Sequence, residues 1–306
     1  MTVRNPEELY ELDSELPELS RPVLLHSLDG FVDAGSTGQL IRDHILDTLE
    51  HRIIGRFDVD SLMDYRARRP VMVYDQDHWE SYEPPELAIH LASDAAGVPF
   101  LFLTGPEPDR LWEGFTASVR SLVERLDVSL TVGFHGIPMG VPHTRPVGLT
   151  PHGTRPELLT GPRPWFGRVQ VPGSASSLLE LRLGEAGHDA IGFAVHVPHY
   201  LSQSQYPAAA VAALDAVVSA TGLAIPGDAL RTAAAATDKE IADQVAGSDE
   251  VEKVVRALEQ QYDAFAGSAE REGLLAEQQQ MPTADELADE FQRFLAEQDG
   301  SSSSDG

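Results

Sequence analysis

Residues 23–51 read VLLHSLDGFVDAGSTGQLIRDHILDTLEH, and three patterns follow one another within them. An apolar run occupies residues 23–28, and the glycine-rich stretch DGFVDAGSTG comes next. Behind it, apolar residues recur close to helical spacing at Leu40, Ile41, Ile45 and Leu49. Short apolar runs are typical of buried strands, and a spacing of three to four residues is typical of one helix face. A strand, a glycine-rich turn and a helix in this order predict the first half of a βαβ unit.

The same alternation continues towards the C-terminal side of the chain. Apolar patterns predict further helices at 105–126, 174–187 and 205–222. They predict further strands at 52–59, 71–74, 86–92, 99–105, 128–134, 168–171 and 189–197. Strands that alternate with helices are typical of a parallel sheet that is covered on both faces. The sequence therefore predicts an α/β fold in three layers, with a mostly parallel sheet and helices on both of its faces.

The patterns divide the chain into four regions. Residues 1–20 are predicted to be an acidic N-terminal arm, and residues 21–225 to be the α/β domain. Residues 226–298 lack strand patterns and carry apolar residues at helical intervals, at Val251, Val254, Val255, Leu258, Tyr262 and Phe265. We expect them to form a C-terminal helical appendage that packs on the α/β domain or on a neighbouring subunit. Residues 299–306 are predicted to be a disordered tail.

Negative charge is concentrated at the two ends of the chain. The formal net charge is −27, and residues 226–306 contribute −13 of it through 19 acidic and 6 basic side chains. A protein that binds nucleic acid needs a dense basic patch, so nucleic acid is not an expected partner. No apolar run approaches the roughly 18 residues that mark a membrane span. The acidic first twenty residues do not resemble a targeting segment, and the chain has no cysteine. We predict a cytoplasmic protein without a membrane partner.

The glycine-rich stretch is the first of three candidate binding loops, because ligands of such sheets bind beyond the carboxyl ends of the strands. It carries Asp29, Asp33, Gly35 and Ser36. A phosphate could meet backbone N–H groups and the start of a helix there. The lysine of a phosphate loop is missing, however, and the two aspartates place negative charge where an anion would bind. A tight turn that caps the following helix is the alternative interpretation.

The other two candidate loops both contain the tripeptide Val-Pro-His directly after a predicted strand. VPHTRP (141–146) contains His143, Thr144 and Arg145, and HVPHY (196–200) contains His199 and Tyr200. Prolines on both sides of the first group restrict its backbone. A histidine and an arginine held in this way suit an anionic or sugar-like ligand, while a rigid turn is the alternative. We expect the two loops to meet at one pocket or subunit contact.

The sequence predicts no catalytic group, metal or cofactor. His196 and His199 lie three apart across a proline, and no recognised spacing supplies the further ligands of a zinc site. The Gly-x-Ser-x-Gly motif of a nucleophile elbow is absent from the sequence as well. These loops are therefore predicted to bind a ligand or a subunit rather than to catalyse a reaction.

Five motifs together carry a family resemblance. They are DGFVDAGSTG, RARRP at 66–70, TGPEPDRLW at 104–112, VPHTRP and HVPHY. In this order they resemble the proteasome assembly chaperone 2 family, in its actinobacterial branch, over residues 20–220. The resemblance implies a fold similar to nucleoside phosphorylases and nucleoside hydrolase-like proteins, and self-association as a homotrimer. For eukaryotic and archaeal relatives it implies binding to proteasome α subunits and promotion of ring assembly without chemistry.

The chain departs from this pattern at its end. Chaperones that dock on proteasome rings carry a hydrophobic residue and a tyrosine near the C-terminus, whereas this sequence ends in SSSSDG. Docking through the pockets of the α ring is therefore not expected, although another surface could bind proteasome subunits.

Two functions of different classes remain open from the sequence. The first is a non-enzymatic assembly factor or interaction scaffold that resembles the proteasome assembly chaperones. The alternative is a phosphorylase-like or hydrolase-like enzyme, or a binder of a nucleoside-type small molecule, at the carboxyl edge of the sheet. In that case Gly35, Ser36, His143, Arg145 and His199 would bind the substrate.

Overall fold

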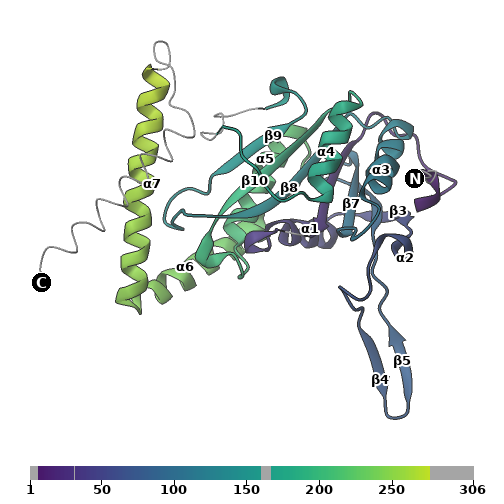
Figure 1. Cartoon of the computed structure of the whole chain (residues 1–306), viewed down its shortest axis with the longest axis horizontal. Helices are drawn as coiled ribbons and strands as arrows, with labels where there is room; N and C mark the ends of the chain where they lie inside the picture. Colours follow the sequence, from purple (N-terminus) through teal and green to yellow (C-terminus); the bar gives the residue numbers. More distant parts are fainter. Residues whose placement is uncertain (1–5, 31, 160–166, 276–306) are drawn as a thin grey trace, which may run out of the picture. The chain divides into compact units, whose positions relative to one another are not determined.

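The computed structural model describes residues 6–30, 32–159 and 167–275, with backbone alone for 265–275 (Figure 1). The chain divides into two compact units. One unit consists of residues 1–163 and 171–259, and the other consists of residues 164–170 and 260–306. The first unit contains all of the strands among the described residues. The predicted tail at 299–306 lies outside the described part of the chain.

A mixed sheet of eight strands forms the centre of the first unit. Its strand order is β1-β3-β6-β7-β2-β8-β10-β9. The strands are β1 (Tyr10–Leu12), β2 (Val23–Asp29), β3 (His51–Phe57), β6 (Ala88–Ser93), β7 (Pro99–Pro106), β8 (Leu130–Met139), β9 (Leu149–Gly153) and β10 (Ala190–Pro198). The four strands β7, β2, β8 and β10 run parallel, and each of the other neighbours in this sheet is antiparallel.

The α/β fold is confirmed, and the sheet is mixed where the sequence predicted it to be mostly parallel. The short link between β6 and β7 shows the physical reason. Only residues 94–98 join these two strands, with Gly97 at a positive φ of 81°. Parallel neighbours need a crossover of a dozen or more residues, so a link of this length enforces an antiparallel pair.

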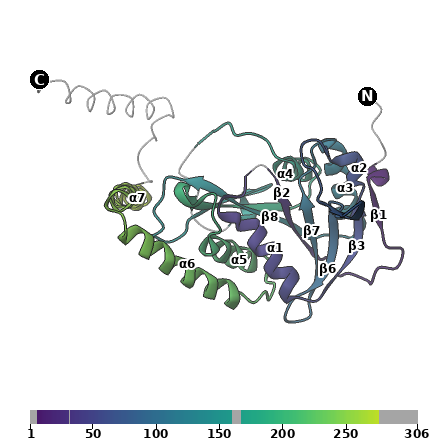
Figure 2. The ribbon, with the colours of Figure 1, turned by 90° about the horizontal axis from the view of Figure 1, so that it is seen from below.

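Helices cover both faces of the sheet, as predicted (Figure 2). On one face lie α1 (Thr37–Thr48), α5 (Pro207–Thr221) and α6 (Asp228–Ala246), and on the other lie α3 (Trp112–Arg125) and α4 (Ala175–Glu185). Neighbouring strand residues point to opposite faces. Leu25 and Phe102 therefore pack in the core on the α1 and α5 side, and Leu24 and Leu103 in the core on the α3 and α4 side.

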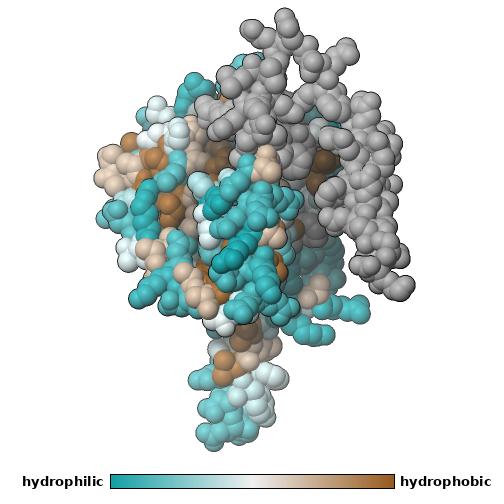
Figure 3. Space-filling model, turned by 90° about the vertical axis from the view of Figure 1, so that its left-hand side faces the viewer, coloured by the Kyte–Doolittle hydropathy of each residue, from teal (hydrophilic) through white to brown (hydrophobic). Residues whose placement is uncertain are grey.

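A hairpin outside the main sheet extends from the first unit (Figure 1). It consists of β4 (Met72–Asp75) and β5 (His78–Tyr82), which pair only with each other in the described structure. The strand predicted at 71–74 is therefore present, but it does not join the central sheet. Every residue of β4 and β5 is exposed. Figure 3 shows hydrophobic residues near the start of this hairpin and hydrophilic residues at its tip.

Short elements and the C-terminal helix complete the described chain. They are η1 (Pro6–Leu9), η2 (Ala34–Ser36), α2 (Val59–Leu62), η3 (Pro156–Leu158), η4 (His199–Leu201) and α7 (Asp249–Leu275). The acidic arm contributes more than a solvated tail, because Leu9 and Tyr10 are buried and β1 pairs with β3. No helix in the described ranges is both long and apolar enough to cross a membrane.

Two local predictions differ from the structure. The strand predicted at 168–171 is not formed, and β9 lies at residues 149–153, where the sequence patterns predicted no strand. Pro151 within β9 hides the strand pattern, since proline cannot donate a ladder hydrogen bond. Because β9 is an edge strand, the proline is tolerated there. The place beside β10 is thus taken by β9.

Candidate functional site

The two Val-Pro-His loops meet beyond the carboxyl ends of β8 and β10. These strands are parallel neighbours, with Val197 opposite Pro138 and Pro198 opposite Met139. The backbone N–H of His143 donates to the Tyr200 hydroxyl at 2.9 Å, and His143 Nδ1 lies 2.7 Å from the same oxygen. The two rings stand edge to face, with centroids 6.0 Å apart. Strand order thus brings together two loops that are far apart in sequence.

The glycine-rich turn between β2 and α1 adopts a conformation that few residues favour. Gly35 has a φ of 68° and Ser36 a φ of 51°. The Gly35 N–H donates to the Ser202 carbonyl at 3.0 Å, and the Tyr206 N–H donates to the Gly35 carbonyl at 2.9 Å. A Cβ atom on Gly35 would lie 3.0 Å from the Tyr206 Cβ. Glycine is needed at this position for both its angles and its size.

Asp33 occupies the place where an anion would bind at the start of α1. Its carboxylate accepts the backbone N–H groups of Gly38 at 2.9 Å, Gln39 at 3.1 Å and Gly136 at 3.0 Å. A helix N-terminus stabilises negative charge of this kind. The chain therefore supplies its own anion, and the geometry favours the capping interpretation of this turn over phosphate binding.

Asp29 lies in a second group, at the end of β2. Its carboxylate pairs with Arg42, and its carbonyl accepts from Arg68 at 3.1 Å. Arg68 also donates to the Glu107 carbonyl and to Asp109 Oδ1, the latter at 2.6 Å. Arg68 belongs to the RARRP motif and Glu107 and Asp109 to TGPEPDRLW, so these contacts join three of the five motifs.

Glu107 repeats at α4 what Asp33 does at α1. This buried carboxylate accepts the backbone N–H of Ala175, the first residue of α4, at 2.6 Å. A Cβ atom on Gly30 would lie 2.4 Å from Glu107 Oε2, so glycine is required beside it. The start of α4 is thus also occupied by a carboxylate of the chain itself.

The VPHTRP loop binds a third internal carboxylate. Thr144 Oγ1 donates to Glu259 Oε1 at 2.5 Å, and Arg145 Nη1 lies 3.3 Å from the same oxygen. Glu259 belongs to α7. Burial lowers the pKa of His143, although Asp238 and Glu259 act in the opposite direction. Burial likewise raises the pKa of the Tyr200 hydroxyl.

The predicted site residues fall into three groups, and the two Val-Pro-His loops share one of them. Gly35 lies with Asp33, while Asp29 lies with Arg68. The largest group contains His143, Thr144, Arg145 and Tyr200 with Glu259. His199 is exposed, with its ring 5.4 Å from that of Tyr200. Ser36 is half-buried in the turn.

A layer of three histidines on the α4 side of the sheet was not predicted, and His26 is the buried member of it. His26, His135 and His152 lie near one another, and His152 Nδ1 contacts Glu180 Oε2 of α4 at 2.8 Å. Burial, followed by the neighbouring His135 and His152, lowers the pKa of His26 to about 4. No group of three potential ligands within the described ranges is arranged to hold a metal.

Paired glycines make room for this layer. Gly133 and Gly192 are opposite each other in β8 and β10. A Cβ atom added to Gly133 would lie 2.5 Å from the His26 ring. A Cβ atom added to Gly192 would lie 2.1 Å from the His152 ring. Glycine inside a strand often marks such a close approach. Isolated glycines in the two apolar runs were the available sequence signal.

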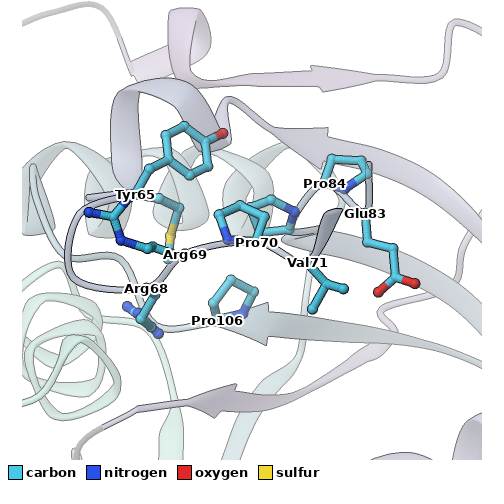
Figure 4. A pocket seen from close by; sticks show the side chains of 10 residues that line it. Tyr65, Arg68, Arg69, Pro70, Val71, Glu83, Pro84 and Pro106 are labelled. Carbon is cyan, nitrogen blue, oxygen red and sulfur yellow. The ribbon is translucent and has the colours of Figure 1, made fainter. Parts of the chain in front are cut away.

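A cavity of 310 Å³ lies at the base of the β4–β5 hairpin, within the first unit (Figure 4). Its walls are mostly apolar, and two arginines and one glutamate add charge. The lining residues are Met63, Tyr65, Arg68, Arg69, Pro70, Val71, Glu83, Pro84, Pro85 and Pro106. Arg68 connects this cavity to the group around Asp29, because its guanidinium bonds both the Asp29 and the Glu107 carbonyl.

Comparison with known proteins supports the resemblance seen in the motifs. The model of the PAC2 family matches residues 27–245. A Mycobacterium tuberculosis protein of unknown function is 46% identical with a TM-score of 0.82, over 87% of this chain and 92% of that one. A Corynebacterium glutamicum protein of unknown function is 40% identical with a TM-score of 0.79, over 84% and 97%.

A third structure is similar in fold. It is a proteasome-assembly chaperone homologue of Mycobacterium tuberculosis, 23% identical with a TM-score of 0.69, over 76% of this chain and 99% of that one. No curated protein matches the chain.

Proposed function

This chain belongs to the PAC2 family, and from that premise we propose that it is a non-enzymatic assembly factor that acts through contacts with other proteins. One partner would be further copies of the same chain, in a homotrimer as the family resemblance implies. The second would be proteasome subunits. The name of the similar Mycobacterium tuberculosis homologue supports the second partner. Cytoplasmic localisation stays a prediction.

The β4–β5 hairpin is the observation that carries this proposal. A two-stranded hairpin alone is marginally stable in water and normally packs on something. Here both strands are exposed throughout, yet large apolar side chains lie on them and directly before β4, at Val71, Met72, Val73, Tyr74, Trp79 and Tyr82. Exposed apolar edge strands readily pair with another chain. The hairpin therefore suits a protein partner better than solvent.

The loops at the strand ends support the same proposal, because they disfavour the nucleoside alternative. The starts of α1 and α4 and the VPHTRP loop each hold a carboxylate of the chain, from Asp33, Glu107 and Glu259. A substrate phosphate would have to compete with these carboxylates. No contact among the described residues favours the nucleoside alternative, so the assembly factor is the better-supported function.

Native mass spectrometry of the tagged protein, purified gently from its own cells, tests this proposal. We expect a homo-oligomer and a protein partner at fixed stoichiometry. The double variant Val73→Ser/Trp79→Ser should lose the oligomer, the partner or both. Leu181→Ser is the matched control, because Leu181 is an exposed apolar residue of α4. A wild-type protein recovered only as a bare monomer would contradict the proposal.

A further inference from the structure

The contact between the VPHTRP loop and α7 has the chemistry of a carboxylate-binding site. The Thr144 hydroxyl and the Arg145 guanidinium converge on the same oxygen of Glu259, at 2.5 and 3.3 Å. Hydrogen bonds to charged groups are stronger than neutral ones, and arginine suits carboxylates in particular. One neutral donor and one cation thus recognise a single carboxylate.

The loop also has support that does not come from α7. Pro142 and Pro146 restrict the backbone on either side of the donors. Both the N–H and the Nδ1 of His143 contact the Tyr200 hydroxyl, which ties the loop to η4. A site that is organised in advance loses less entropy when it binds a ligand. The donors would therefore keep their positions if Glu259 left.

Glu259 is bound weakly enough to be exchanged. The side chains of Arg145 and Glu259 are 29% and 26% exposed, so solvent screens their pairing. An arginine that is mostly covered is costly to leave unpaired, so another carboxylate that arrives as Glu259 leaves is favoured over an empty site. Asp238 and Glu259 both lie close enough to affect His143, so the wall formed by the helices is acidic. An incoming ligand has to replace Glu259 and cannot simply add to it.

We propose that Thr144 and Arg145 form a binding site for an acidic segment of a protein partner, and that Glu259 occupies this site in the free chain. Binding of the partner's carboxylate releases the contact between α7 and the loop. The proposal rests on the assembly-factor function, because it names the chemistry of the partner. The earlier part of α7, up to Glu259, becomes more accessible when the exchange takes place.

Limited trypsin digestion of the purified full chain tests the internal contact. Trypsin cleaves after Lys253 and Arg256, which precede Glu259 on α7. Cleavage of a transiently opened helix follows the population of the open form. We expect Glu259→Gln and Thr144→Val to speed cleavage after Arg256 by about fivefold. Glu250→Gln, at an exposed position of the same helix, should leave the rate unchanged.

Binding of a probe peptide tests the exchange. An acetylated and amidated hexaglutamate peptide should bind Glu259→Gln about fivefold more tightly than wild type. It should also speed cleavage of wild type after Arg256, whereas hexaglutamine should do neither. Arg145→Ala should abolish binding, while Arg66→Ala, at an exposed arginine of another loop, should preserve it.

Equal affinity of hexaglutamate for wild type and Glu259→Gln would overturn the proposal, as would an unchanged cleavage rate in Glu259→Gln. Both assays use the isolated protein and a peptide. Their failure is therefore distinguishable from a failure to recover proteasome subunits, which would count against the assembly-factor function instead.

Discussion

The loops after the parallel strands, which contain DGFVDAGSTG, TGPEPDRLW and VPHTRP, differ from the β4–β5 hairpin in whether their side chains find partners within this chain. The loops are rich in polar and charged groups. The carboxylates of Asp33, Glu107 and Glu259 accept hydrogen bonds from the loops or from the helix starts beside them. The hairpin carries large apolar side chains, and every residue of its strands is exposed. The polar motifs thus have carboxylates of this chain as their partners, while the apolar side chains of the hairpin stay exposed.

Substitution of Gly136 should have the largest effect on the loops. A Cβ atom there would lie 2.0 Å from the Ala34 carbonyl and 2.6 Å from Thr37 Oγ1. Gly136→Ala should therefore lower the free energy of unfolding by about 3 kcal/mol, as overpacking typically does. Urea denaturation measures the change. Gly140→Ala is the matched control, because a Cβ atom there meets nothing within 4 Å; equal losses in the two variants would contradict the close fit of the turn.

The second largest effect should come from acid, which lowers the free energy of unfolding by protonating His26. The pKa of His26 is about 4 in the folded chain, against 6.5 for the free side chain. The neutral ring is favoured by folding, so its contribution is complete above pH 6.5 and is lost as the pH falls towards 4. About 2 kcal/mol should be lost by pH 5.

Urea denaturation at pH 7 and pH 5, on wild type and His26→Gln, measures this pH dependence. The variant should be less sensitive to acid than wild type, whatever its stability at pH 7. An equal change in the two proteins would show that His26 is not the group responsible.

Removing the charge of Asp33 should have a smaller but clear effect. Asp33→Asn keeps the shape of the side chain but weakens its hydrogen bonds to the N–H groups of Gly38, Gln39 and Gly136. We expect a loss of about 1–2 kcal/mol in the free energy of unfolding. Thermal denaturation checks this loss, with Asp47→Asn at an exposed position of α1 as the control. Greater stability in Asp33→Asn would indicate that the site is kept for a ligand instead.

Substitution in the hairpin should have the smallest effect on the stability of a single chain. Trp79 is 63% exposed, so Trp79→Ser should change the free energy of unfolding of the monomer by less than about 0.5 kcal/mol. Self-association, measured by analytical ultracentrifugation, should weaken at the same time. A loss of stability without any loss of association would show that the hairpin serves the fold of the single chain, and it would contradict this prediction.

Local patterns predicted most of the fold correctly. The run at 23–28 became β2, and the helices at 174–187 and 205–222 became α4 and α5. These predictions were confirmed because alternation and helical spacing reflect which face of an element is buried. The direction of the edge strands was missed, as were β5 and β9. Pairing direction depends on link length and on which edge is vacant, and no single segment contains that information.

The sequence by itself determined the alternation of most strands and helices, the helical character of residues 228–275 and the positions of the three polar loops. Only the tertiary structure decided what those loops bind. Asp33 reaches Gly136 across 103 residues, Glu107 reaches Ala175 across 68, and Thr144 reaches Glu259 across 115. Local spacing carries no signal for such contacts, because they arise when the sheet places strand ends side by side. The same residue types could have bound a phosphate or a sugar, and the folded chain supplied carboxylates in their place.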